Sequence, residues 1–437
     1  MMSMSTELKL SDTGADLDPH SVYEPQSTTP SAGIDIRPIP RISVQGFCLS
    51  DNTSRTIEIA AEDRRMSKAH VKVHMGGIPA AIEFYAQAPT PNLIIVEAGN
   101  ERSALVADLE RLAEYCDAGT KVIVIGGIND VSLYRDLIHQ GVSEYLVAPI
   151  DVYQLIGSIG ELYGDPDTEP LGRTIAFFGV KGGCGSSTVA HNSAWALARN
   201  FENEVSVADF DLPFGTAGLD FNQDPLQGVL EAVSAPERLD ETFLDRILSK
   251  CSEHLSLLAS PASLERTYDY GENAFDGLID TMRSCTPTIV LDVPHVWNGW
   301  TKNVLVSADE VVIVAEPDLA NLRNAKNVVD TLKQLRPNDR LPQLVMNRVN
   351  VPKRPEIKPD EFASALGLPA PLIIPFDPQL FGTAANNGQM IAELDAKHSV
   401  SVLFSELAQQ VSGRSDTNKA KRTGLNSLLS KLIGKTA

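Results

Sequence analysis

The sequence predicts an α/β protein with two doubly wound parallel-sheet domains, a tail before them and a basic segment after them. Short apolar bursts alternate with segments of helical spacing along most of the chain, which is typical of parallel strands joined by helices. The alternation runs in two series, separated by the polar, Pro- and Gly-bearing linker 164–172. The length of 437 residues and an apolar content of 43% are sufficient for two such domains.

The first series predicts a small domain over 41–163. Its segment 101–116 has helical spacing, with Leu105, Leu109 and Leu112 on one face. Strands that alternate with helices over such a short stretch indicate a small doubly wound sheet. The expected strands are 41–49, 71–75, 92–98, 121–127 and 144–149.

The second series predicts a larger α/β domain over 173–412, with helices between its strands. The expected strands are 174–180, 205–211, 255–260, 288–293, 310–316, 342–349 and 371–376.

The two ends of the chain differ from these domains in composition. Residues 1–40 are rich in Ser, Thr, Pro and Asp without an apolar period, so we expect a disordered tail. Residues 413–437 are basic, and we expect them to form an amphipathic helix that binds an anionic membrane surface. The alternative is a helix that docks on the protein's own core or in a partner's groove. Its apolar stripe is Leu425, Leu428, Leu429, Leu432 and Ile433.

The charge balance excludes several classes of protein. The 37 basic and 57 acidic residues give a net charge of −20, which disfavours a nucleic-acid partner unless a basic patch overrides it. No apolar run approaches the roughly 18 residues of a membrane span, and the N-terminus has no apolar signal region. The five cysteines include no CxxC pair, so we interpret them as reduced thiols. These features predict a cytoplasmic protein.

A glycine-rich turn follows the first strand of the second domain, in the sequence VKGGCGSSTVAHNSAWALA. A strand, such a turn and then a helix predict a phosphate-binding loop. Gly182, Gly183 and Gly185 lack side chains, so their N–H groups can point at phosphate oxygens, and the following helix adds its positive end. The alternative is that the glycines only turn the chain.

This loop resembles the deviant Walker A motif KGGxGK[ST]T of the MinD/ParA ATPases, which implies ATP and Mg²⁺ as ligands. Lys181 stands at the signature lysine that contacts nucleotide across a dimer interface, and Ser187 at the magnesium-binding hydroxyl. Ser186 replaces the lysine that usually contacts the β- and γ-phosphates of the nucleotide. Loss of a charge-assisted hydrogen bond of about 1.5–3 kcal/mol would weaken nucleotide binding about 10- to 150-fold. Because the same lysine is missing for catalysis, whether the chain hydrolyses ATP is left open. The matching residues are Lys181, Gly182, Gly183, Cys184, Gly185, Ser186, Ser187 and Thr188.

Further landmarks of these ATPases follow in order. Asp211, two residues after Asp209, matches the residue that positions the attacking water, although DxD at a strand end is common. Asp292 matches the Walker B carboxylate, which would hold magnesium through water. Asn347 matches the base-reading residue, with Arg348 beside it, although Asn347 could simply form a turn. The segment 374–393 resembles the part that closes over the base, beginning with Ile374 and Pro375.

The whole arrangement over 41–412 resembles the CpaE/TadZ proteins of Flp/Tad pilus assembly, which carry a receiver-like domain before an ATPase-like one. The resemblance implies a pilus assembly and localisation factor that binds ATP and acts as a homodimer. Such a switch or scaffold would recruit other pilus assembly proteins at the inner membrane. It would be cytoplasmic and peripherally attached, and a polar position is compatible with this role.

The first domain resembles a receiver that has lost its chemistry. A receiver needs an aspartate after its third strand, and here Glu97 is at or next to that position. Gly126 and Gly127 stand where a hydroxyl is needed, and Ala148 replaces the lysine before Pro149. We therefore expect no aspartyl phosphorylation, and a role in docking or dimerisation.

Three alternatives remain for the function. A partition ATPase acting on DNA would need a basic surface, which the acidic balance disfavours. A response regulator with an ATPase-like output would need the receiver chemistry. A scaffold that never hydrolyses ATP fits the loss of the loop lysine.

Overall fold

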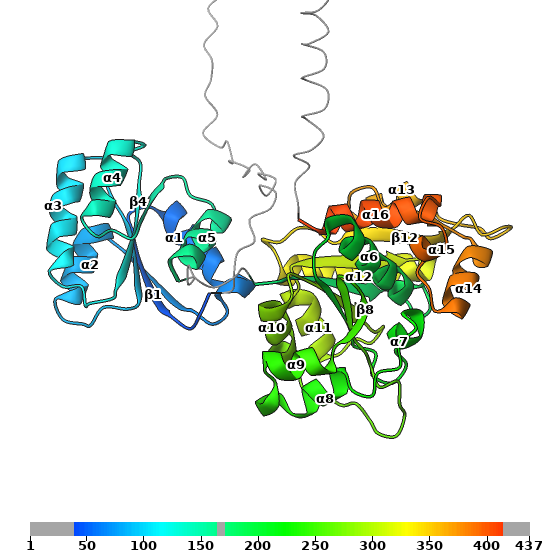
Figure 1. Cartoon of the computed structure of the whole chain (residues 1–437). Coiled ribbons are helices and arrows are strands. Elements are labelled where there is room, and N and C mark those ends of the chain that lie inside the picture. The colour runs from blue at the N-terminus through cyan, green and yellow to red at the C-terminus, as the bar shows by residue number, and fades with distance from the viewer. Residues whose placement is uncertain (1–38, 164–170, 414–437) are drawn as a thin grey trace, which may run out of the picture. The chain divides into compact units, whose positions relative to one another are not determined.

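The structure is a computed structural model that describes residues 39–163 and 171–413 (Figure 1). The predicted N-terminal tail, except for its last two residues, lies outside the described residues. So do most of the linker 164–172 and the amphipathic helix expected within 413–437.

Residues 39–163 contain a five-stranded parallel sheet in the order β2-β1-β3-β4-β5. Helices α1 and α5 cover one face, and α2, α3 and α4 cover the other (Figure 1). The strands are β1 (Ser43–Cys48), β2 (His70–Met75), β3 (Leu93–Glu97), β4 (Lys121–Gly126) and β5 (Glu144–Val147). The helices are α1 (Asp51–Ala61), the 3-10 turn η1 (Arg64–Met66), α2 (Gly77–Tyr85), α3 (Arg102–Ala113), α4 (Val131–His139) and α5 (Val152–Tyr163).

Local sequence explains these elements. β3 is central and buried on both faces, which suits its continuous run of β-branched and aliphatic residues. Helix α3 buries Leu105, Leu109 and Leu112, the face predicted from their spacing. Helix α1 begins after Ser50, whose side chain accepts a hydrogen bond from the Thr53 N–H as an N-cap.

Residues 171–413 contain an eight-stranded sheet in the order β13-β12-β11-β6-β10-β7-β9-β8. The strands are β6 (Arg173–Gly179), β7 (Val205–Asp209), β8 (Ser249–Ser252), β9 (Leu255–Leu258), β10 (Thr288–Val293), β11 (Glu310–Ala315), β12 (Gln343–Val349) and β13 (Leu372–Pro375). The helices are α6 (Ser186–Phe201), α7 (Ala217–Asp220), α8 (Val229–Ser234), η2 (Pro236–Arg238), α9 (Glu241–Ile247), α10 (Asp276–Cys285), α11 (Gly299–Ser307), α12 (Leu319–Leu335), α13 (Pro359–Leu366), α14 (Pro378–Asn387), α15 (Ile391–Leu394) and α16 (Ser399–Val411).

The predicted fold class is confirmed, with one addition. Strand β8 is antiparallel to β9 at the edge of the sheet, so this sheet is mixed rather than purely parallel. Strand β8 was not among the expected strands, because its residues SKCS carry neither an apolar run nor a clear alternation.

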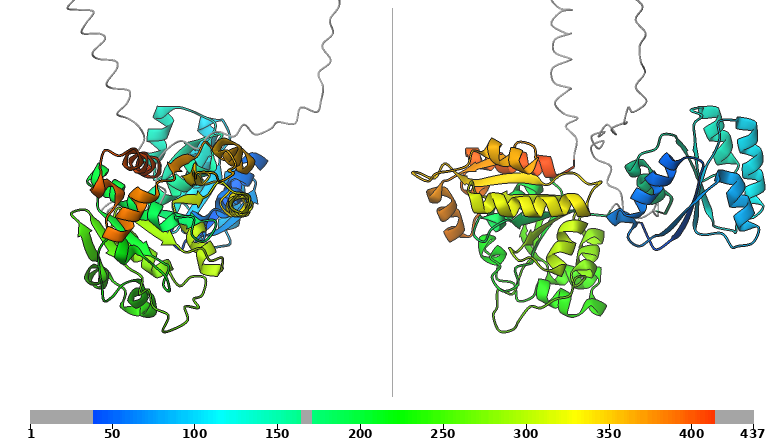
Figure 2. Two further views of the ribbon diagram at one scale, coloured as in Figure 1. Left: turned by 90° about the vertical axis from the view of Figure 1, so that its right-hand side faces the viewer. Right: turned by 180° about the vertical axis from the view of Figure 1, so that it is seen from behind.

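The topology of the larger sheet creates a site at one edge. Helices cover both faces of the sheet (Figure 2). One apolar core lies under α6 and α16, and the other lies under α10, α11 and α12. Strand β6 lies in the middle, parallel to β10 on one side and β11 on the other. The next strand along the chain, β7, lies beyond β10, and α/β proteins typically bind ligands at the carboxyl ends of strands where the strand order changes direction in this way.

Within residues 39–163 and 171–413, no helix is both long and apolar enough to span a bilayer.

Candidate nucleotide-binding site

The predicted glycine loop lies between β6 and α6, at the carboxyl edge of the sheet. Gly183 and Gly185 have φ angles of 80° and 90°, in the left-handed region that favours glycine. A Cβ at Gly185 would lie 2.4 Å from the Asn347 side-chain nitrogen. The positive φ angles therefore favour glycine at both positions, and at Gly185 the close neighbour Asn347 also leaves no room for a side chain.

Most backbone N–H groups of the loop are available to a ligand. In the part of the chain that the structure describes, the N–H groups of Gly182, Gly183, Gly185 and Ser187 pair with no protein acceptor, whereas the Ser186 N–H bonds to the Cys184 side chain. Helix α6 begins at Ser186, so its positive end adds to these donors. Such an array can bind a phosphate group.

The carbonyl groups of the same loop are held by side chains from distant parts of the domain. Because these acceptors are already paired, the loop keeps its shape without a ligand. Two of the donors, His295 and Asn324, were not predicted from the sequence, since no local pattern marks them. The four hydrogen bonds are His295 Nδ1 to the Gly179 oxygen (2.7 Å), Asn324 Nδ2 to Val180 (2.9 Å), Arg348 Nη1 to Gly183 (2.8 Å) and Asn347 Nδ2 to Cys184 (2.8 Å).

The two loop positions that decide the charge differ in exposure. The Lys181 side chain is 48% exposed, and its Nζ lies 3.4 Å from an Asp318 carboxylate oxygen. The Ser186 hydroxyl, at the position of the missing lysine, is buried and has no hydrogen-bond partner within the described residues. The loop itself thus carries one cation, which is held loosely.

An acidic cluster lies next to the loop. Asp292 and Asp209 are partners in the register of β10 and β7, and both are buried. Burial, together with the charge of Asp292, raises the pKa of Asp209 to about 7. Both carboxylates follow runs of buried apolar residues in their strands, which places them at the carboxyl edge.

A fully buried histidine neutralises part of this charge. His191, on α6, has Nδ1 2.8 Å from an Asp220 oxygen and Nε2 3.3 Å from Asp292 Oδ2. The second contact is an ion pair rather than an aligned hydrogen bond. Burial disfavours the charged ring, but Asp220 and Asp292 outweigh it and raise the pKa of His191 to about 10. His191 was not predicted from the sequence, although it follows Ser187 by one helical turn.

Asp211 lies two residues beyond the end of β7 and is half-buried. One of its oxygens accepts a hydrogen bond from the Phe214 N–H at 3.1 Å, and its own N–H donates to Asp209. Burial raises the pKa of the Asp211 carboxyl. Its second oxygen has no protein partner in the described ranges, so it is available to a water molecule.

The donors expected for Mg²⁺ fit that ion. The Ser187 hydroxyl makes no hydrogen bond within the described chain, and Asp292 keeps Oδ1 free of protein partners there. Oxygen donors of this kind, with the rest of the shell supplied by water and phosphate, are those that Mg²⁺ prefers. Ser187 would bind the ion directly and Asp292 through water.

Comparison with known proteins places the chain in a family. A family model described as an AAA domain matches residues 172–344. MinD, the septum site-determining protein of Synechocystis sp., is 26% identical over 280 residues, which is 60% of this chain and 100% of that protein. A ParA family ATPase from Chlorobium tepidum TLS is 27% identical and covers 54% of this chain and 98% of its own, with a TM-score of 0.50.

The chain is also similar to the pilus assembly protein CpaE from Caulobacter crescentus CB15. That protein is 46% identical over 98% of its solved chain and 30% of this one, with a TM-score of 0.29. The chain belongs to the CpaE-like proteins of the MinD/ParA superfamily. The family resemblance predicted from the motifs is thereby confirmed.

In this CpaE-like chain, the residues expected to contact the nucleotide base include two, Asn347 and Arg348, that contact the glycine loop. The Asn347 amide is buried, and it donates to the Cys184 oxygen while its own oxygen accepts from the Arg348 N–H. Pro375 ends β13 and pairs in register with Val349 of β12. The structure therefore brings Asn347 and Arg348 to the phosphate loop, and it leaves their contact with a base as a prediction.

Cys184, in the variable position of the CpaE-like loop, is a packing residue. Its side chain is buried, and Sγ donates to the Val314 oxygen at 3.3 Å. Burial raises the pKa of this thiol. Because the thiolate is the reactive form, this environment disfavours oxidation.

In the receiver-like domain, Glu97, at or next to the position of the phosphorylated aspartate, has a structural role. The Glu97 carboxylate accepts hydrogen bonds from the N–H groups of Leu49 and Ser50 and from the hydroxyls of Ser50 and Thr53, at 2.7–2.9 Å. Partial burial opposes the charge, but these bonds lower the pKa of Glu97. The acid therefore ties the end of β3 to the start of α1.

Proposed function

We propose that this CpaE-like chain is an ATP-binding assembly and localisation factor of a Flp/Tad-type pilus. The observation that carries the proposal is the glycine loop, with unpaired N–H groups and with its carbonyls held by side chains. Affinity comes from the backbone donors, the helix end and nearby cations. The side chains that complete the site are Ser187 and Asp292 for the magnesium of the nucleotide.

Titration calorimetry on the full chain, with magnesium and millimolar ATP, tests the proposal. Gly185→Ala should abolish the heat, because a Cβ there is strained at a positive φ and meets Asn347. Gly271→Ala is the matched control, since a Cβ at Gly271 meets no atom within 4 Å. Absence of heat in the wild type would exclude ATP as the ligand.

Hydrolysis is a separate question from binding. The loop has no lysine for the β- and γ-phosphates, whereas Asp211 keeps one oxygen for a water molecule. A phosphate-release assay decides between a slow ATPase and a scaffold. Turnover that is lost in Asp211→Asn would support the enzyme, and a wild-type rate equal to that of Gly185→Ala would support the scaffold.

We further propose a homodimer in which Lys181 reaches the partner's nucleotide. The half-exposed lysine is held by one contact of 3.4 Å to Asp318, so it can turn outward. Lys181→Ala should lower the ATP-dependent dimer fraction in sedimentation velocity, and Lys302→Ala, on helix α11 and not in the loop, should leave it unchanged. An unchanged fraction in Lys181→Ala would place the interface elsewhere.

Attachment to the inner membrane is proposed through residues 413–437. Full-length protein should float with anionic vesicles, while a 1–412 truncation and Leu429→Glu should not. Equal flotation of all three would refute this role.

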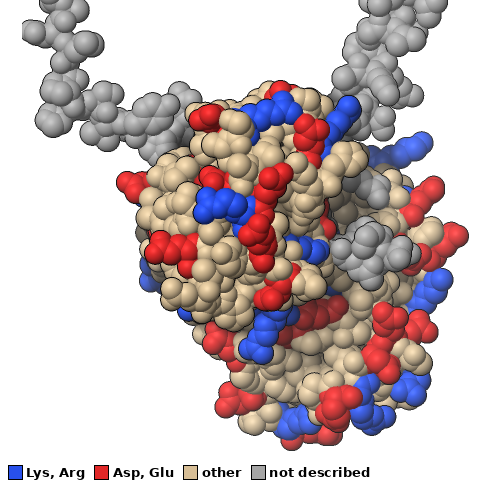
Figure 3. Space-filling view, turned by 90° about the vertical axis from the view of Figure 1, so that its left-hand side faces the viewer, with Lys and Arg blue, Asp and Glu red and all other residues tan. Residues whose placement is uncertain are grey.

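DNA partitioning is the rival function. On the face that Figure 3 shows, acidic and basic side chains are interspersed with uncharged ones and no basic patch covers it. Salt-sensitive binding to duplex DNA in a mobility-shift assay would favour the rival, and would count against the pilus role.

A further inference from the structure

We propose that Arg348 supplies the phosphate-binding positive charge that Ser186 cannot, an inference that rests on the proposed binding of ATP. The missing lysine leaves the loop without a cation at the usual position. Arg348 comes from β12, far away in the sequence, and its guanidinium is in direct hydrogen-bond contact with the glycine loop.

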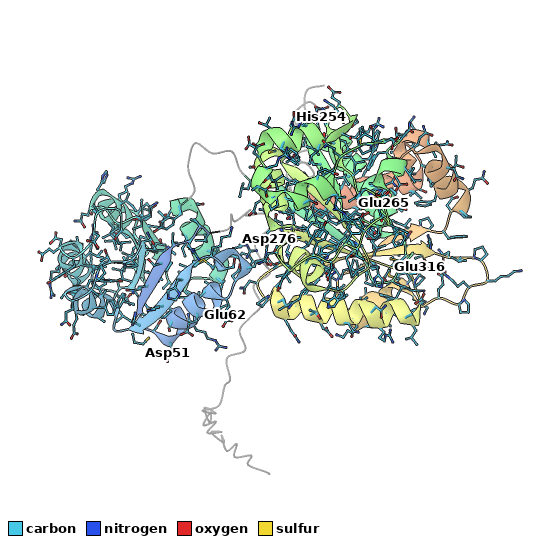
Figure 4. The ribbon with its side chains drawn as sticks, turned by 90° about the horizontal axis from the view of Figure 1, so that it is seen from below. Asp51, Glu62, His254, Glu265, Asp276 and Glu316 are labelled. Atoms are coloured by element: carbon cyan, nitrogen blue, oxygen red, sulfur yellow. The ribbon has the colours of Figure 1, made fainter. Side chains whose placement is uncertain are left out.

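Two contacts position this guanidinium. Nη1 donates to the Gly183 oxygen at 2.8 Å and lies 2.9 Å from Oε1 of Glu316, the residue that follows β11 (labelled in Figure 4). In the described ranges, Nε and Nη2 of Arg348 have no protein partner, and 47% of the side chain is exposed. A planar guanidinium with two free donors can form a bidentate hydrogen-bonded contact with a phosphate.

The backbone at Arg348 is unusual for such a side chain. Its φ is 52°, in the left-handed region that a glycine would occupy without strain. Asn347 holds this geometry by accepting from the Arg348 N–H at 2.9 Å. Strained backbone that is held by its surroundings is typical of binding sites. The strain here directs a long cationic side chain onto the loop.

The neighbouring charges allow Arg348 to change partners. Glu316 is shared, because its second oxygen pairs with Arg354 Nη1 at 2.8 Å. If Arg348 turned toward a phosphate, Glu316 would keep one cation and would not be left buried without a partner. Lys181 is the competing source of charge, but its Nζ contacts Asp318, whereas the Arg348 guanidinium donates to the loop itself at Gly183.

The test is a double-mutant cycle between positions 186 and 348, measured as the ATP dissociation constant in the full chain. Arg348→Gln should weaken ATP binding about 10- to 150-fold, the range for one lost charge-assisted contact. If Arg348 substitutes for the loop lysine, Ser186→Lys should restore most of the affinity in Arg348→Gln and add less to the wild type.

Two further variants separate charge from folding. Arg348→Gly relieves the positive φ, so its thermal midpoint should be equal to or higher than that of the wild type while ATP binding falls. Arg340→Gln is the control and should retain ATP affinity, because Arg340 pairs with Glu310 at the start of β11, whereas Glu316 follows the end of that strand.

If Arg348→Gly and Arg348→Gln both bind ATP as tightly as the wild type, the inference about Arg348 is overturned while the proposed binding of ATP stands. Equal gains from Ser186→Lys with and without Arg348 would also overturn it. If the wild type binds no ATP at all, the proposed function fails, and this inference fails with it.

Discussion

Replacement of His191 by Gln should strongly destabilise the larger domain. The ring is fully buried between Asp220 and Asp292 and is charged at neutral pH, because its pKa is raised to about 10. Glutamine retains hydrogen-bonding capacity but not the charge. Breaking a buried ion pair by removing one partner costs about 3–5 kcal/mol. For a domain of this size, that corresponds to a fall in Tm of about 6–20 °C.

The assay uses the intrinsic tryptophans. All three tryptophans of the chain, Trp195, Trp297 and Trp300, lie in the larger domain, so their fluorescence follows its unfolding alone. His254→Gln is the control, because that histidine also pairs with a carboxylate, Glu204, but is partly exposed. Its effect should be below about 1 kcal/mol.

The pH dependence tests the charge itself. A histidine whose pKa rises from about 6.5 in the unfolded chain to about 10 in the folded one contributes its full stabilisation below pH 6.5. That contribution is lost as the pH rises toward 10. The difference in unfolding free energy between wild type and His191→Gln should therefore be largest near pH 6 and small near pH 10. A difference that is under 1 kcal/mol at pH 6, or the same at both pH values, would refute the reasoning.

Two further predictions concern Glu97 and the cysteines. Glu97→Gln should lower the Tm of the receiver-like domain, in a transition seen by circular dichroism but not by tryptophan fluorescence. Because the pKa of Glu97 is lowered, its contribution is fully present above the unfolded pKa of about 4.3 and is lost as the pH falls below that value, so the Tm difference between variant and wild type should shrink steadily on further acidification. Under native conditions, iodoacetamide should modify the exposed Cys285 well before the buried Cys184, as read by peptide mass spectrometry. Faster reaction at Cys184 would show that the loop opens.

Much of the fold could be predicted from the sequence because it is encoded locally. Each buried parallel strand carries its own apolar run, and α3 carries its own helical spacing in Leu105, Leu109 and Leu112. The glycine loop is also local, since Gly183 and Gly185 must adopt positive φ angles within a few residues. For that reason the sequence alone locates the loop together with its flanking strand and helix.

Only the tertiary structure decided which partners complete the site. Asn324 and Arg348 hold the loop from more than 140 residues away, and His191 meets Asp292 only because α6 packs over β10. The edge strand β8 has no pattern of its own and is defined by its pairing with β9. Local sequence determines periodicity and backbone preference within a segment. Hydrogen bonds and ion pairs between distant segments depend on how the strands are ordered in the sheet, which no single segment encodes.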